Sequence, residues 1–157
     1  AGEGGGANLA ADVCMMAKKK NIKPPMHQLL IYPIAGPDLN TESYQKFAAA
    51  QPLNKAKMMW FFKQYLQNDH QINDPRIALV NADLQGLPGT TVITAGLDPL
   101  YSEGVLLVEK LKAAKVKVES KNYPNVTHEF FGLNSLVPQA TEAQLYAGEQ
   151  LKAAFAN

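Results

Sequence analysis

Residues able to perform acid–base chemistry lie in two predicted loops of this chain, and a cluster of glycines opens it. Asp98 lies in residues 96–100, directly after a β-branched run. His128 lies in residues 126–131, between a predicted strand and the last predicted helix. The glycines of residues 2–6 lead straight into a helical pattern. A carboxylate that orients an imidazole is the pairing that general acid–base catalysis of acyl transfer requires.

Helical and extended patterns alternate along the chain and predict the elements that position these residues. Dense apolar runs bounded by Pro and Gly predict buried strands at Met26–Ile34 and at Thr90–Ala95. Alternation predicts a third strand at Val116–Tyr123, with one solvent-exposed face and a place near the sheet edge. Helices are predicted at Ala7–Lys20, where the apolar residues Leu9, Val13 and Met16 or Ala17 recur at spacings of three and four, and at Tyr101–Lys115 and Thr141–Phe155.

The order of these elements predicts an α/β fold with a parallel sheet and right-handed crossovers. In such a sheet, the glycine cluster, Asp98 and His128 all lie at the carboxyl ends of strands, where the active sites of these folds form. On the helix at 101–115, four residues are predicted to form the apolar face: Val105, Leu106, Val108 and Leu111.

Residues 37–88 differ in character and are predicted to be an insertion between core elements. They contain a short predicted helix at Glu42–Ala49 and an amphipathic one at Lys55–Gln67. We therefore divide the single domain into residues 1–36 (glycine turn, first helix and first core strand), 37–88 (cap-like insertion) and 89–157 (core with the acid and histidine loops).

A glycine-rich turn, an acid and a histidine follow one another in the chain order of an α/β-hydrolase triad. The chain resembles the carboxyl-terminal part of the hormone-sensitive-lipase-like carboxylesterases of the α/β-hydrolase fold, over essentially its whole length. The matching segments are Ala1-Gly-Glu-Gly-Gly-Gly-Ala-Asn-Leu-Ala10 (family pattern G-[DE]-S-A-G-G-N-L-A), Asp98-Pro-Leu-Tyr-Ser-Glu-Gly104 (D-P-L-R-[SD]-E-G), Thr127-His-Glu-Phe-Phe-Gly132, and Pro52-Leu-Asn54, which resembles the cap.

The chain departs from the family pattern in two respects. The position of the nucleophilic serine is occupied by Gly4, and the following positions are altered to Gly5 and Ala7. The strands before the turn and the glycine-rich oxyanion loop, which the family has in its first half, are not in this sequence.

By this resemblance, the chain is expected to belong to a carboxylic ester hydrolase of the esterase and lipase family. Asp98 and His128 would be the acid and base of its triad, and the Gly5 N–H would be one oxyanion donor. Without the serine at position 4 no acyl-enzyme can form, so the chain as written is predicted to be inactive. The alternative is a catalytically silent hydrolase-fold module that binds an apolar ligand or a partner chain.

Composition limits the partners and the compartment. Fifteen Lys and Arg against fourteen Asp and Glu leave a net charge of +1, which predicts no nucleic-acid partner. Apolar runs are too short for a membrane span. The single cysteine, Cys14, cannot form an internal disulfide, so a reducing, cytoplasmic location is expected. A small apolar ester is the predicted substrate, with no cofactor.

Several of these residues also have simpler interpretations. Asp98 before Pro99 could be a helix N-cap, and His128 could be a surface loop residue. Cys14 fits a helix core better than a nucleophile. Residues 58–62 (Met-Met-Trp-Phe-Phe) fit either the core of the cap or a pocket wall for acyl chains.

The sequence argues against two other classes of ligand, dinucleotides and metal ions. The spacing Gly2-x-Gly4-x-x-Ala7 fits a dinucleotide fingerprint, but no preceding strand is evident and no acidic residue follows at the required distance. His27 and His70 have no acidic or cysteine partner at metal-ligand spacing, so no metal site is predicted.

The strand at Met26–Ile34 lacks the polar alternation of an edge strand. In the family fold it pairs with the strand that leads into the glycine turn. We therefore expect this chain to need its amino-terminal half, or to associate with itself through an exposed sheet edge.

Overall fold

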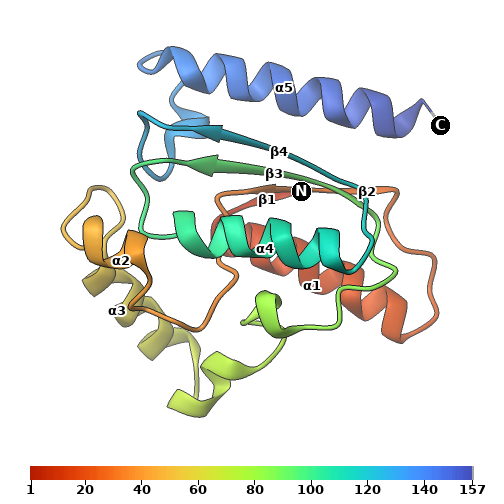
Figure 1. Cartoon of the computed structure of the whole chain (residues 1–157), viewed down its shortest axis with the longest axis horizontal. Helices are drawn as coiled ribbons and strands as arrows, with labels where there is room; N and C mark the ends of the chain where they lie inside the picture. The colour runs from red at the N-terminus through yellow and green to blue at the C-terminus, as the bar shows by residue number, and fades with distance from the viewer. Residues whose placement is uncertain (157) are drawn as a thin grey trace.

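A computed structural model describes residues 1–156 of the chain. Among these residues, four parallel strands form one sheet in the order β1-β2-β3-β4 (Figure 1). The predicted α/β class with a parallel sheet is therefore confirmed. The strands are β1 (Gly2–Glu3), β2 (His27–Ile31), β3 (Gly89–Ala95) and β4 (Val118–Tyr123).

Helices cover both faces of the sheet. Helices α1 and α4 lie on one face and α5 lies on the other (Figure 1). No helix among the described residues is long and apolar enough to cross a membrane. The three helices are α1 (Gly5–Lys19), α4 (Tyr101–Ala113) and α5 (Pro138–Phe155).

The apolar run in β2 supplies a core on each side of the sheet. Leu30 packs toward α1 and α4, whereas Leu29 and Ile31 pack toward α5. Successive residues of a strand point to opposite faces, so only a continuous apolar run can supply both cores. The predicted strand is confirmed in its centre, although Met26 is exposed and Ile34 lies beyond its end.

At the other side of the sheet, β4 pairs with β3 as an edge strand, as predicted. It begins at Val118 rather than Val116, and its residues 119–122 are all exposed, so the prediction of a single solvent-exposed face is wrong for the middle of the strand. Its last residue, Tyr123, is buried in the core under α5. The edge position explains why a strand with so little buried surface tolerates polar residues.

Two predicted apolar faces are wrong in part. On α4, Val105 and Leu106 are more than one-third exposed, and the buried face instead contains Leu107 beside Val108 and Leu111. The helix is rotated relative to the prediction because its first turn buries a charged residue and a glycine, which a hydrophobic count does not score: Glu103 and Gly104.

The apolar stripe used to predict α1 is exposed. Leu9, Val13 and Met16 are 53%, 56% and 44% exposed, while Ala7, Ala11 and Cys14 face the sheet. Small side chains let the helix lie close to the strands, whereas the larger ones project away from them. An open apolar stripe on one side of the molecule results.

Helix ends differ from the prediction by a few residues. α1 begins at Gly5 because the turn itself enters the helix, and α5 begins at Pro138, whose fixed φ suits a first helical position. Within residues 37–88 the two predicted helices are shorter than predicted, α2 (Glu42–Lys46) and α3 (Lys55–Tyr65). Two 3₁₀ turns that were not predicted follow them, η1 (Asp69–Asn73) and η2 (Leu79–Asn81).

Helices α2 and α3 of the segment 37–88 lie beside the carboxyl ends of the strands, and the end of the segment leads back to the start of β3 (Figure 1). Thr41 and Asn54 cap α2 and α3 by accepting hydrogen bonds from the N–H groups of Tyr44 and Lys57. A small third core joins this segment to the start of α4: Tyr44, Leu53, Met58, Phe62 and Leu100. The segment is therefore fixed over the edge of the sheet where the predicted site residues lie.

Candidate active site

The glycine cluster forms a sharp turn between β1 and α1. Gly4 has φ 52° and ψ −115°, in the left-handed region of φ that glycine tolerates best. Its N–H donates to the Ile31 carbonyl at 2.9 Å, which ties the turn to the end of β2. A β-carbon on Gly2 would overlap the Gly6 carbonyl, so this tight approach requires glycine at position 2.

Asp98 and His128 are held together in the interior. The His128 Nδ1 and the Asp98 Oδ2 lie 2.7 Å apart, and both residues are buried. The other carboxylate oxygen of Asp98 accepts a hydrogen bond from the Leu100 N–H at 2.9 Å. Asp98 therefore supports the local turn before α4 and also contacts the histidine. The N-cap of α4 is Leu100, with no side-chain hydrogen bond to the cap, so the interpretation of Asp98 as a helix N-cap is wrong.

Backbone hydrogen bonds join the loops that carry this pair. The Gly96 N–H donates to the Tyr123 carbonyl at 2.8 Å, and the Leu97 N–H donates to the Val126 carbonyl at 3.0 Å. These bonds continue the β3–β4 ladder past the end of the strands. The separation of Asp98 and His128 is thus set by backbone pairing as well as by their own contact.

The outer nitrogen of His128 faces the glycine turn. A carboxylate only accepts hydrogen bonds, so the contact with Asp98 places the proton on Nδ1 and leaves the lone pair on Nε2. A β-carbon on Gly4 would lie 3.2 Å from that Nε2. A short side chain at position 4 would therefore reach the basic nitrogen of the imidazole.

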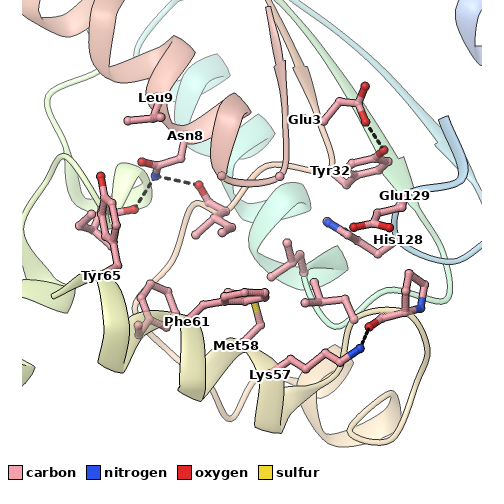
Figure 2. Close-up of a pocket in the computed structure, with 18 of the residues that line it drawn as sticks. Glu3, Asn8, Leu9, Tyr32, Lys57, Met58, Phe61, Tyr65, His128 and Glu129 are labelled. Carbon is pink, nitrogen blue, oxygen red and sulfur yellow. Dashed lines mark hydrogen bonds between the residues drawn. The ribbon is translucent and has the colours of Figure 1, made fainter. Parts of the chain in front are cut away.

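A cavity of about 1070 Å³ opens in front of this turn. Gly4 and Gly5 line it, and Figure 2 shows Met58 and Phe61 of α3 across the cavity from Tyr32 and His128. Gly5 is the first residue of α1, so its N–H is among those that a helix leaves without an intrahelical acceptor. An electron-rich oxygen placed between Gly5 and His128 would meet the positive end of the helix.

The aromatic run on α3 divides between the two predicted roles. Met58 and Phe62 are buried in the third core and also line the cavity, and Phe61 lines it while remaining 46% exposed. Met59 and Trp60 are exposed and are not among the residues that line the cavity. The aromatic run therefore contributes both to the third core and to the wall of the cavity.

Two buried polar residues near the turn were not predicted as site residues. Asn8 donates from Nδ2 to the carbonyls of Ile34 and Ile77, both at 2.9 Å, and so links α1 to the inserted segment. Glu103 is buried and accepts from the Ala35 N–H at 2.8 Å. Asn8 lies in the matching segment 1–10 and Glu103 in the matching segment 98–104. Their place in these segments, as polar residues on helices that pack against the sheet, could have identified them.

Glu103 has a strongly perturbed acidity. Burial raises the pKa of its carboxyl from 4.5 to about 8. The hydrogen bonds from the backbone of Ala35 and Gly36 lower it, and the nearby charges of Asp98 and Asp38 raise it. The dominant cause is desolvation, which disfavours the ionised form.

A tyrosine and a glutamate also line the cavity beside His128. Tyr32 follows β2, and its ring centroid lies 4.3 Å from that of the imidazole. Its hydroxyl donates to the Glu3 carboxylate at 2.6 Å (Figure 2). Neither residue was predicted as part of the site, although Glu3 lies within the first motif and Tyr32 precedes a proline at a strand end.

The remaining candidate side chains lie away from this site. Cys14 is buried against the sheet, and burial raises the pKa of its thiol, which suits a core residue. His27 is at the opposite end of β2 and contacts Thr91 at 2.8 Å. His70 lies in an exposed 3₁₀ turn. Residues 1–156 contain no group of three or more His, Cys, Asp or Glu arranged to hold a metal.

Comparison with known proteins gives consistent results. Residues 1–132 match a protein-family model described as the alpha/beta hydrolase fold. The carboxylesterase NlhH of Mycobacterium tuberculosis is 35% identical over 147 residues, which are 91% of this chain and 46% of that protein. An ethyl acetate hydrolase of Pseudomonas putida is 27% identical over 153 residues, 96% of this chain and 48% of that protein.

Solved structures agree with the sequence comparison. The thermostable carboxylesterase EstE1, cloned from a metagenomic library, superposes with a TM-score of 0.93 at 31% identity, over 98% of this chain and 53% of that one. An ester hydrolase from the metagenome of Lake Arreo, complexed with a phosphonate, gives a TM-score of 0.93 at 34% identity, over 99% and 50%. The chain thus spans about half the length of the relatives it matches.

Proposed function

Since this chain belongs to the alpha/beta hydrolase family, we propose that it carries the acid, the base and the nucleophile turn of a carboxylic ester hydrolase, with the nucleophile absent. One observation carries the proposal. The Asp98–His128 pair, at 2.7 Å, points Nε2 toward the position where a side chain on residue 4 would begin. The carboxylesterase relatives support ester hydrolysis as the chemistry of the family.

With a serine at position 4, each residue would have a defined role. His128 Nε2 would take the hydroxyl proton as the oxygen attacks the ester carbonyl, and would return it to the departing alcohol. Water would then hydrolyse the acyl-enzyme with the same histidine as base. Asp98 would hold the imidazole in the required tautomer. Gly4 has no hydroxyl, so this covalent route is closed to the chain as it stands.

The oxyanion that forms during attack would need hydrogen-bond donors. We propose the Gly5 N–H as one of them, because Gly5 is the first residue of α1 and lines the cavity. By resemblance to the family, the other donors come from a glycine-rich loop in the half of the protein that precedes the turn. We assign one donor to this chain and the rest to that half.

The cavity suits a small apolar ester. Its wall near α3 contains four apolar residues, Leu53, Met58, Phe61 and Phe62, beside the polar Lys57 and Gln64. We therefore propose that residues 37–88 act as a cap over the core formed by residues 1–36 and 89–157. A relative described as an ethyl acetate hydrolase makes short-chain esters the first substrates to try.

A partner half would cover surfaces that this chain leaves open. The apolar stripe of Leu9, Val13 and Met16 on α1 is about half exposed. β1 pairs with β2 at only two positions, Gly2↔Leu30 and Glu3↔Ile31, so the amino-terminal part of β2 is open on that side. We propose that the first half of the fold, or failing that a second copy, occupies this edge.

The second candidate function is a silent binding module. The glycine at position 4 favours it, because the site then keeps its cavity but loses the attacking group. A binding module has no need of Asp98 and His128, so their retained geometry favours an esterase ancestry over this alternative.

The test is reconstruction of the triad. Gly4→Ser, expressed together with the first half of a related esterase, should hydrolyse p-nitrophenyl acetate and become inactivated by an organophosphate. His128→Ala in that background should abolish the activity, while His27→Ala, at the other end of β2, should leave it unchanged. A folded, assembled Gly4→Ser protein without activity would refute the triad assignment and favour the binding module.

A further inference from the structure

Tyr32 contacts both sides of the candidate active site. Its ring lies against the His128 imidazole at 4.3 Å with a 48° angle between the ring planes. Its hydroxyl donates to Glu3, the residue immediately before Gly4, at 2.6 Å. Figure 2 shows the phenol between the glutamate and the histidine. One side chain thus bridges the turn and the base.

The backbone at Tyr32 is strained. Its φ is 34°, a value that a bulky L-residue adopts only at an energetic cost. Glycine would adopt it freely, yet the position holds a tyrosine that is 2% exposed. Its N–H donates to the Ile93 carbonyl at 2.7 Å, so neighbouring structure holds the strained conformation in place. Strain kept at a cavity wall is typical of functional positions.

The phenol is fixed as a hydrogen-bond donor. Burial, the hydrogen bond to Glu3 and the nearby carboxylates of Glu129 and Asp98 all raise the pKa of Tyr32 far above its usual range. The hydroxyl therefore stays protonated and donates to Glu3 throughout the pH range of ordinary assays. Phe130 also packs edge-on against the Tyr32 ring, with 6.0 Å between the ring centroids.

We propose that Tyr32, through its hydrogen bond to Glu3, is a positioning residue that sets the orientation of His128 relative to the turn at Gly4. Asp98 contacts only the inner nitrogen of the imidazole and leaves the ring free to tilt about that contact. The Tyr32 ring packs against the imidazole and limits this tilt. The Glu3 contact locks the phenol to the turn, so the turn and the base move as one unit. The proposal deepens the proposed function and rests on it.

The first measurement uses the chain as it exists and needs no activity. In proton NMR spectra, the Nδ1–H of His128 should give a low-field signal that is protected from exchange with water. Two substitutions remove the Tyr32–Glu3 hydrogen bond: Glu3→Ala removes the acceptor, at an exposed position, and Tyr32→Phe removes the donor, at a buried one. Both should broaden or lose the signal, whereas Glu3→Gln, which keeps an acceptor, should retain it.

The matched control is Tyr123→Phe. Tyr123 is buried in the same core under α5 and packs on Phe130, but its hydroxyl has no hydrogen-bond partner among the described residues. Tyr123→Phe therefore changes the core in the same way without touching the site. If Tyr123→Phe broadens the signal as much as Tyr32→Phe does, the effect is general loosening and the proposal is wrong.

The second measurement uses Gly4→Ser assembled with its first half. Loss of one positioning hydrogen bond should lower kcat about tenfold in Tyr32→Phe and in Glu3→Ala, with KM changed less than about twofold. Tyr123→Phe should change neither constant. An inactive Gly4→Ser parent contradicts the proposed function, and the NMR result still decides the role of Tyr32. An active parent whose kcat survives both substitutions overturns the positioning role itself.

Discussion

Glu103 predicts a specific dependence of stability on pH. Its carboxyl is buried at the start of α4, and its pKa in the folded protein is raised from 4.5 to about 8. Between these values the folded protein binds a proton that the unfolded chain has released. Stability linked to this group is therefore present at low pH and is lost as the pH rises toward 8.

The size of the effect follows from the same pKa values. A tenfold change in proton affinity corresponds to about 1.4 kcal/mol. For a pKa raised from 4.5 to about 8, the loss of unfolding free energy above pH 8 is on the order of 5 kcal/mol. That loss is comparable with the whole stability of many domains, so local opening that hydrates the carboxylate will reduce it.

Glu103→Gln isolates this contribution. The amide oxygen can still accept from the N–H groups of Ala35 and Gly36, which Glu103 Oε1 contacts at 2.8 and 3.3 Å, but the side chain no longer ionises. Denaturant unfolding should give similar stabilities for variant and wild type at pH 5. At pH 9 the variant should be more stable by about 3–5 kcal/mol.

Glu109→Gln on the exposed side of α4 is the control, because it removes the same charge without burial. It should leave the pH dependence unchanged. A constant difference between Glu103→Gln and wild type from pH 5 to pH 9 would show that Glu103 ionises normally. The assignment of a protonated carboxyl beside Asp98 would then be wrong.

Three further predictions concern activity, packing and association. The unaltered chain should hydrolyse p-nitrophenyl acetate barely above buffer; a rate like that of a serine esterase, blocked by an organophosphate, would contradict the assignment of Gly4. Asn8→Ala should lower the unfolding free energy by about 2–4 kcal/mol in denaturant titration, because two carbonyls lose their donor. Sedimentation velocity at micromolar concentration should show association through the open side of β2; a sharp monomer boundary with cooperative thermal unfolding would argue against it.

The parallel sheet could be predicted because its strands have local signatures. The run at β2 is apolar at successive positions, and β3 is rich in β-branched residues, so each needs a layer of helices on both faces. The closeness of Asp98 and His128 could be predicted because each follows a strand, and the carboxyl ends of these parallel strands lie at the same edge of the sheet. Their contact is a consequence of topology more than of any local preference.

Helix orientation could not be obtained from apolar periodicity alone. On α1 the larger apolar residues Leu9 and Val13 face outward, and the close packing on the sheet uses alanines. A hydrophobic pattern gives the largest side chains the most weight, whereas close helix–sheet packing favours small ones. The burial of Glu103 was not predicted for a related reason, since a charged residue at a helix start is ordinarily solvent-exposed.

The strained residues around His128 bear on the choice between esterase and binding module. Tyr32 and Glu129 both have positive φ, at 34° and 68°, and both border the histidine. Such conformations cost on the order of 1–3 kcal/mol each, so a fold that needed only a stable cavity would gain by losing them. Glycine at position 4 relieves strain at the turn, where φ is 52°, but these two non-glycine residues retain theirs. Strained residues beside the Asp98–His128 pair therefore favour the proposed esterase ancestry, with Gly4 at the nucleophile position, over a pocket built for binding alone.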